Sequence, residues 1–249
     1  MKFVEFLHSK ALDSSWALVF LAVSAGFTII YFGFALAAVF LTKKVLPTLK
    51  IGQVVESGAI PRGQGYKEII NSLASILVFG AYGVLTLKLD QMGWIHIRWN
   101  FNAWALATDL LALTLWNELH FYLYHRVVHI PWLYHRIHRI HHLSIIPTPF
   151  AAYSFHWFDS VLLWSVLVIG MFLYDFSILA LILFPVLGLT IGIMGHMNYE
   201  IFTRVPLNHV LKGSTRHALH HTLVNGNYGF MLPYLDQIFK TQLKIPGQR

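Results

Sequence analysis

The stretch HRVVHIPWLYHRIHRIHH, residues 125–142, carries six histidines and directly follows a strongly apolar segment. A second histidine run, HALHH, occupies residues 217–221, and His196 ends another apolar segment. Neutral imidazole is a good ligand for transition metals, but it is costly to bury without a partner. So many histidines in an apolar chain therefore predict a shared metal centre.

The composition of the chain indicates a polytopic membrane protein. Its 249 residues are 56% hydrophobic and 12% charged, with a mean hydropathy of +0.58, which is too apolar for an ordinary soluble domain. The absence of cysteine excludes disulfides and iron–sulfur clusters and leaves nitrogen and oxygen as metal ligands. The net charge is +7, and the basic residues lie beside apolar runs. This position favours a role in membrane topology or in contact with lipid headgroups over binding of a nucleic acid.

Long apolar runs predict four to five transmembrane or re-entrant helices. A helix needs about 20 apolar residues to cross the hydrocarbon core. We expect transmembrane helices over residues 14–42 and 67–88 and a third helix over 103–129. A helical hairpin follows, in which 158–173 and 176–196 are separated by only two residues. The run at 158–173 is short, so a re-entrant segment is an alternative to a full crossing there.

The positive charges predict which ends of these helices share a side. If the loop over 43–67 is cytoplasmic, alternation places 126–142 and 200–249 on the same side. Fourteen of the eighteen Lys and Arg residues are then cytoplasmic, as the positive-inside rule prefers. The histidine clusters lie there too. The expected fold is all-α, one integral-membrane domain over 1–249, with a cytoplasmic-face helical cap that holds a polyhistidine di-metal site.

Helical spacing brings the histidines of each motif onto one face. His125 and His129 are four residues apart, and the pattern H-x-x-H-H occurs twice. Rings at positions 0, 3 and 4 of a helix span about 100 degrees and can converge on one metal or on a pair. Eight imidazoles from these motifs exceed what one ion with an open position needs, which favours a dinuclear centre. The predicted metal ligands are His125, His129, His138, His141, His142, His217, His220 and His221, with His196 as a ninth.

Two carboxylates and three further histidines are weaker candidates. Glu118 lies seven residues before His125 on the same helix face, where it could accept the free ring N–H of a ligand. Glu200 could add a carboxylate ligand or bridge. His120 points away from the ligand face. It forms, with His135 and His156, a lesser set for which we expect supporting or structural roles.

The motifs HRVVH, HRIHH and HALHH together resemble the integral-membrane fatty acid hydroxylase and sterol desaturase superfamily. Residues 147–159 and 212–229 look most like its sterol delta-5 desaturase branch, and the resemblance runs from about 118 to 241. It implies that 102–249 form the catalytic region and that the predicted histidines bind iron. It also matches His156 to a recurrent histidine, Asn227 to an N-Y-G element and Asp236 to a later aspartate of the family.

The resemblance implies a non-haem di-iron oxidoreductase, a monooxygenase (hydroxylase) or a desaturase, acting on a sterol or fatty acyl chain of a membrane lipid. It would need two iron ions, dioxygen, and electrons from a separate reductase or ferredoxin-like donor. We expect an apolar substrate channel lined by aromatic side chains such as Phe150, Tyr153, Phe155 and Trp157. The expected location is a bacterial inner membrane, or the endoplasmic reticulum of a eukaryote, with the site facing the cytoplasm.

Two other functions stay open at this point, because spacing alone does not separate iron from zinc or manganese. A zinc-dependent membrane hydrolase needs fewer ligands and a catalytic base. A metal-ion transporter needs ionisable residues that face one another at mid-membrane. Asp109 is the acidic residue placed deep in a predicted span, and we expect it to be an interhelical hydrogen-bond partner. Gly188 and Gly192 have the spacing of close helix packing.

Overall fold

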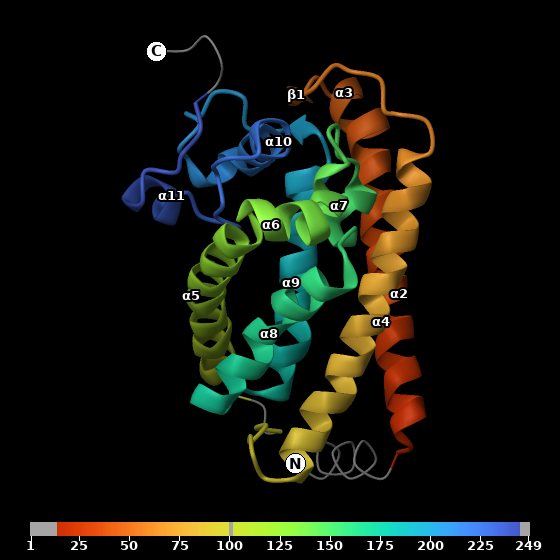
Figure 1. The fold of residues 1–249 in the computed structure, drawn as a ribbon, viewed down its shortest axis with the longest axis vertical. Helices are drawn as coiled ribbons and strands as arrows, with labels where there is room; N and C mark the ends of the chain where they lie inside the picture. Colours follow the sequence, from red (N-terminus) through yellow and green to blue (C-terminus); the bar gives the residue numbers. More distant parts are fainter. Residues whose placement is uncertain (1–13, 100–101, 245–249) are drawn as a thin grey trace.

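A computed structural model describes residues 14–99 and 102–244 as a bundle of helices with a cap of short elements at one end (Figure 1). The bundle consists of α2 (Trp16–Phe40), α4 (Gln64–Gln91), α5 (Ala103–Val128), α8 (Trp157–Leu173) and α9 (Ile178–His196). The cap contains α3 (Leu46–Thr48), β1 (Gln53–Val54), α6 (Pro131–Leu133), α7 (Arg139–His142), β2 (Tyr199–Glu200), α10 (Gly213–Leu223) and α11 (Tyr234–Ile238). The predicted all-α class is confirmed.

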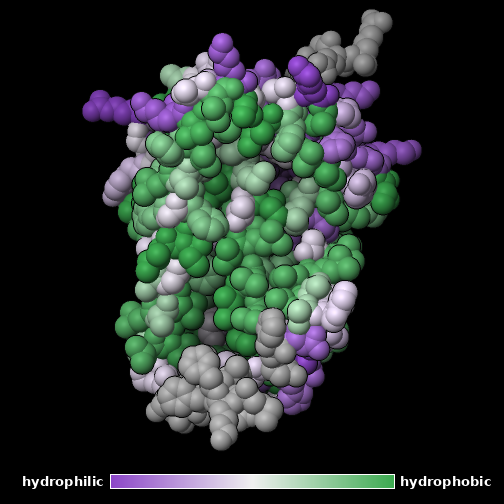
Figure 2. All heavy atoms as spheres, turned by 180° about the vertical axis from the view of Figure 1, so that it is seen from behind, coloured by the Kyte–Doolittle hydropathy of each residue, from purple (hydrophilic) through white to green (hydrophobic). Residues whose placement is uncertain are grey.

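The bundle has the surface of a membrane protein. The helix from Trp16 to Thr48, α4 and α9 are long and apolar enough to cross a membrane, and α8 is a shorter apolar helix of 17 residues. Figure 2 shows hydrophobic side chains over the middle of one face and hydrophilic ones toward its ends. Large apolar side chains such as Ile29 and Leu111 are exposed on the helices, which suits lipid better than water. The chain is therefore an integral membrane protein.

A two-stranded ribbon joins distant parts of the cap. Gln53 of β1 pairs antiparallel with Glu200 of β2, and Val54 pairs with Tyr199. The amide of Asn198 extends this contact through hydrogen bonds to the backbone of Glu56. The loop before α4, the segment around α7 and the segment after α9 thus lie at one end of the bundle (Figure 1). This is the common end that alternation predicted.

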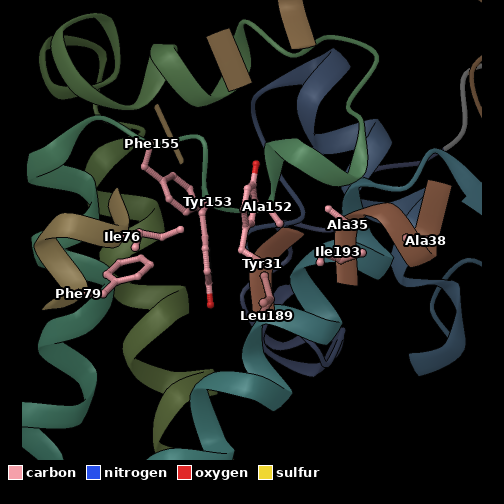
Figure 3. Close-up of a cluster of buried hydrophobic side chains, with 10 residues drawn as sticks. All are labelled: Tyr31, Ala35, Ala38, Ile76, Phe79, Ala152, Tyr153, Phe155, Leu189 and Ile193. Carbon is pink, nitrogen blue, oxygen red and sulfur yellow. The ribbon is translucent and has the colours of Figure 1, made fainter. Parts of the chain in front are cut away.

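The chain between α7 and α8 (residues 143–156), here called the re-entrant segment, enters the bundle as irregular backbone around a short 3₁₀ helix, Pro149–Tyr153. Its Phe150 carbonyl accepts hydrogen bonds from the Tyr31 hydroxyl (2.8 Å) and the Ser72 hydroxyl (3.0 Å). Figure 3 shows Tyr153 of this segment between Phe79 and Tyr31, where it fills the apolar core. Irregular backbone is tolerated at such depth only where the protein itself satisfies it. Tyr31 of α2 and Ser72 of α4 supply such partners to the Phe150 carbonyl.

An ion pair closes the opposite end of the bundle. Asp109, in the second turn of α5, is fully buried and accepts from the Arg98 guanidinium at 2.6 Å. Its second oxygen accepts from the backbone N–H of Ser177, the residue that caps α9, at 2.9 Å. Asp109 is thus the predicted interhelical partner, although it lies nearer the end of its helix than we expected.

Replacing Asp109 by Asn should destabilise the fold. The change removes the charge that pairs with Arg98 and alters a buried acceptor, for which we expect a loss of about 1–3 kcal/mol. Thermal unfolding in detergent would measure it, with Asp175→Asn, the same change at an exposed neighbour, as the control. Identical melting temperatures for the Asp109→Asn variant and the unaltered protein would contradict this account.

Candidate metal centre

Nine histidine rings meet in two adjacent groups where the cap covers the bundle. Within each group, one nitrogen of every ring lies within 4.8 Å of the others. The first group comprises His125, His129, His138, His142 and His220, and the second comprises His141, His196, His217 and His221. All nine histidines predicted as ligands are brought together in this way.

Each H-x-x-H-H motif contributes to both groups. His138 and His142 enter the first group, whereas His141 between them enters the second. In the motif on α10, His220 belongs to the first group, whereas His217 and His221 belong to the second. Residues four apart on a helix lie nearly in line, while a residue three away turns aside. The groups touch, because the His142 and His221 rings are 4.8 Å apart between centroids.

The ring nitrogens have the arrangement that a pair of metal ions would satisfy. Both nitrogens of His129 and of His142 are buried with no hydrogen-bond partner among the described residues. A buried polar atom of this kind needs a partner. In the second group, the His196 Nε2 atom lies 2.9 Å from Nε2 of His217 and 3.2 Å from Nε2 of His141. Nitrogens that converge so closely from several rings fit shared cations.

Burial keeps these rings in the form that binds metal. It lowers the pKa of His220 to about 3 and lowers the pKa of His142 and His221 well below the ordinary histidine value. Neighbouring imidazoles act in the same direction, since each disfavours a positive charge on the next. The lowered pKa of these three histidines favours the neutral imidazole, which is the form that binds a metal.

Backbone carbonyls orient four of the rings. A ring that donates from Nδ1 keeps its lone pair on Nε2, so these contacts select the nitrogen that faces the group. The Nδ1 atoms of four rings donate to backbone carbonyl oxygens: His125 to Tyr228 (2.9 Å), His141 to Ser154 (3.2 Å), His196 to Gly192 (2.6 Å) and His220 to Gly226 (2.6 Å).

A fifth ring is oriented by a carboxylate that the sequence analysis did not select. His138 donates from Nδ1 to Asp159 at 2.6 Å, and both side chains are buried. An aspartate in this position fixes the tautomer and makes the imidazole a better ligand. Its one signal in the sequence is its place in the first turn of α8, three residues after His156.

The role predicted for Glu118 toward a histidine is wrong. Its two oxygens accept from the backbone N–H groups of Met231 and Leu232, each at 3.0 Å. Seven helical residues correspond to about 10.5 Å along the axis, which is too far for it to reach the ring of His125. Glu118 instead holds the C-terminal segment against α5.

Glu200 also lies outside both groups. Its carboxylate accepts from the hydroxyl of Thr215 at 2.7 Å and from the backbone N–H of Phe202 at 3.0 Å. These contacts engage both oxygens and join β2 to the start of α10, whereas the carboxylate ligand we considered would have to lie within one of the groups.

Asn227 and Asp236 support the centre through the loop that carries two of the orienting carbonyls. Asp236 accepts from the backbone N–H groups of Tyr228 and Gly229, each at 2.8 Å. Asn227, at a positive φ of 53°, donates to the carbonyl of Arg216 at 3.0 Å. A side chain at Gly226 would collide with the backbone of a neighbouring segment. The loop is therefore held rigidly, and its carbonyls with it.

The three lesser histidines stay away from the two groups. His120 contacts the hydroxyl of Ser165 at 2.9 Å, and His135 is exposed. His156 accepts from the backbone N–H of Phe158 at 3.3 Å and so caps the start of α8. These contacts agree with supporting or structural roles.

An apolar cavity ends on the histidines. It lies among α5, α8 and α9, and rings of both groups line it. Of the aromatic residues expected to line a substrate channel, Tyr153 and Phe155 line this cavity. Trp157 is exposed, and Phe150 packs in the core of the bundle. The centre therefore faces a space suited to an apolar molecule.

Replacing Asp159 by Asn should weaken metal binding about 10- to 100-fold, because His138 loses the charged partner that orients it. Competition with a chelator of known affinity would measure this. Asp175→Asn is the matched control at an exposed site. Equal metal affinities for both variants would show that Asp159 has no influence on the centre.

Comparison with known proteins identifies several similar proteins. The chain is 29% identical to a Delta(7)-sterol 5(6)-desaturase of Schizosaccharomyces pombe over 168 residues, which are 63% of this chain and 44% of that one. It is 31% identical to mouse lathosterol oxidase over 148 residues, 59% and 46% of the two chains. It is 31% identical to a very-long-chain aldehyde decarbonylase of Oryza sativa subsp. japonica over 153 residues, 57% and 24% of the two chains. The matches thus span less than half of each relative, and no solved structure matches.

A family model described as fatty acid hydroxylase matches residues 110–241. The matched region is more than half of the chain, and it contains all nine histidines of the two groups together with Asp159. The chain belongs to the fatty acid hydroxylase family.

Proposed function

We propose that this protein is an oxygen-dependent di-iron oxidoreductase that hydroxylates or desaturates a C–H position of a membrane lipid, such as a sterol or a fatty acyl chain. The observation that carries the proposal is the pair of all-histidine groups at the end of an apolar cavity. Relatives named as a sterol desaturase and a lathosterol oxidase support oxidation of a lipid.

The nine histidines would hold two iron ions, one in each group. Iron bound there would supply the activation of dioxygen, with electrons from a separate reductase or ferredoxin-like donor. The chain's own residues set the conditions for this chemistry. Backbone carbonyls and Asp159 fix the ring orientations, and burial favours the neutral form of His220 by lowering its pKa.

The cavity walls would hold the lipid and exclude water. Phe121 and His125 lie one turn apart on α5, so an apolar chain packed on the phenyl ring is presented to the histidines. The apolar lining also protects the oxidised carbon from competing reactions with water. The protein would thus add two things to the chemistry of the metal: positioning of the lipid and exclusion of water.

We place the active centre in a catalytic region over residues 102–249 of a single membrane domain. The spans predicted over 14–42 and 67–88 correspond to α2 and α4, which pack on the re-entrant segment and so support the centre from one side. The abundance of Lys and Arg in the segments that share the capped end supports a cytoplasmic orientation. The membrane would be a bacterial inner membrane, or the endoplasmic reticulum in a eukaryote.

The competing functions find less support. Neither group contains a carboxylate that could serve as the base of a zinc hydrolase, and Asp159 is engaged by His138. A transporter would need ionisable residues facing one another across the membrane. Asp109 instead forms a closed contact with Arg98 and Ser177.

Metal content tests the two-ion arrangement. We expect about two iron ions per chain after reconstitution, and about one in the His142→Ala variant, because both nitrogens of His142 are buried without a protein partner. Elemental analysis of the purified protein would measure this. His135→Ala, at an exposed histidine outside the groups, should retain both ions. Full metal content in the His142→Ala variant would contradict the assigned ligand set.

Lipid products test the reaction. The protein is loaded anaerobically with ferrous iron, given an electron donor and membrane lipids, and then exposed to dioxygen. Mass spectrometry should show a lipid that gains one oxygen if the protein is a hydroxylase, or loses two hydrogens if it is a desaturase. The His220→Ala variant should give neither. The absence of an oxygen-dependent product with every lipid class tried would overturn the proposal.

A further inference from the structure

Asn117 places a polar side chain in the apolar cavity at a distance from the histidines. It lies on the face of α5 that lines the cavity and is only 5% exposed. No hydrogen bond of its side-chain amide to any described residue is present, and it lies outside the small set of residues with further contacts. The amide therefore has donors and an acceptor available to a molecule in the cavity.

Packing alone does not explain an amide at this position. An amide in apolar surroundings is costly unless it has a hydrogen-bond partner, and in a membrane-embedded helix such polar groups mark functional positions. The residues four before and four after it on α5 are apolar: Leu113 belongs to a hydrophobic cluster, and Phe121 lines the cavity. A leucine would suit these surroundings better than asparagine.

The residues that line the cavity extend along α5 from Asn117 to His125. Asn117 precedes His125 by eight residues, which is about 12 Å along the helix. On the opposite wall, Phe184 and Gly188 of α9 line the same space. A Cβ atom added at Gly188 would meet nothing within 4 Å, so this glycine leaves the cavity open. It lines the cavity and does not form the close helix contact that its spacing predicted.

We propose that Asn117 binds the hydroxyl or carbonyl oxygen of a neutral lipid substrate and thereby selects the carbon that faces the metal centre. This inference rests on the proposed function and deepens it. An amide both donates and accepts, and it satisfies an uncharged oxygen without burying a charge. The oxidised carbon would then lie about 12 Å from the polar group, toward the other end of the molecule.

The test measures binding in the full-length, metal-loaded protein in detergent, with no reductant present. Radiolabelled 1-hexadecanol is bound and then displaced by unlabelled 1-hexadecanol or by n-hexadecane. The unaltered protein should prefer the alcohol. Asn117→Leu should weaken alcohol binding about three- to tenfold, the loss expected for one hydrogen bond, and leave alkane binding unchanged.

Two further variants make the result specific. Asn117→Gln keeps the amide and should keep the preference for the alcohol. Gly188→Leu fills the open space and should weaken both ligands equally, which places them in this cavity. The proposal is overturned if Asn117→Leu leaves alcohol binding unchanged, if it weakens both ligands equally, or if Gly188→Leu affects neither. Since the assay has no turnover, its failure is distinct from the absence of an oxygen-dependent product.

Discussion

The requirement that buried imidazole nitrogens have partners governs this structure. Nine rings are gathered where the cap meets the bundle, and protein groups engage only part of their nitrogens. A backbone carbonyl or a carboxylate orients five of the rings, and the cations we propose would satisfy nitrogens that have no protein partner. The elements around the centre are arranged to supply those partners from several distant segments.

The supporting contacts form successive layers outward from the rings. The carbonyl of Tyr228 orients His125, and Asp236 in turn holds the backbone N–H of Tyr228. Glu118, which does not reach a ring, fixes the next part of the same segment against α5. Residues with no direct contact to a histidine therefore still determine where the histidines point.

Much of the fold and of the centre could be predicted from local spacing. The apolar runs located the helices to within a few residues, and the histidine motifs identified all nine rings because helical periodicity fixes their direction. Asp159 was missed because it meets His138 only after the re-entrant segment folds back between them. Glu118 was misassigned for the related reason that sharing a helix face does not imply being within reach. The division of the rings into groups of five and four depends on how α7 and α10 face each other, which no local pattern contains.

The crossed division of the two H-x-x-H-H motifs has a mechanical consequence. Because α7 and α10 each supply rings to both groups, neither helix can swing away and open one group alone. A displacement of α7 disturbs one ring of each group, and a displacement of α10 disturbs one ring of the first group and two of the second. The two groups are thus coupled mechanically, because a movement of either helix disturbs rings in both.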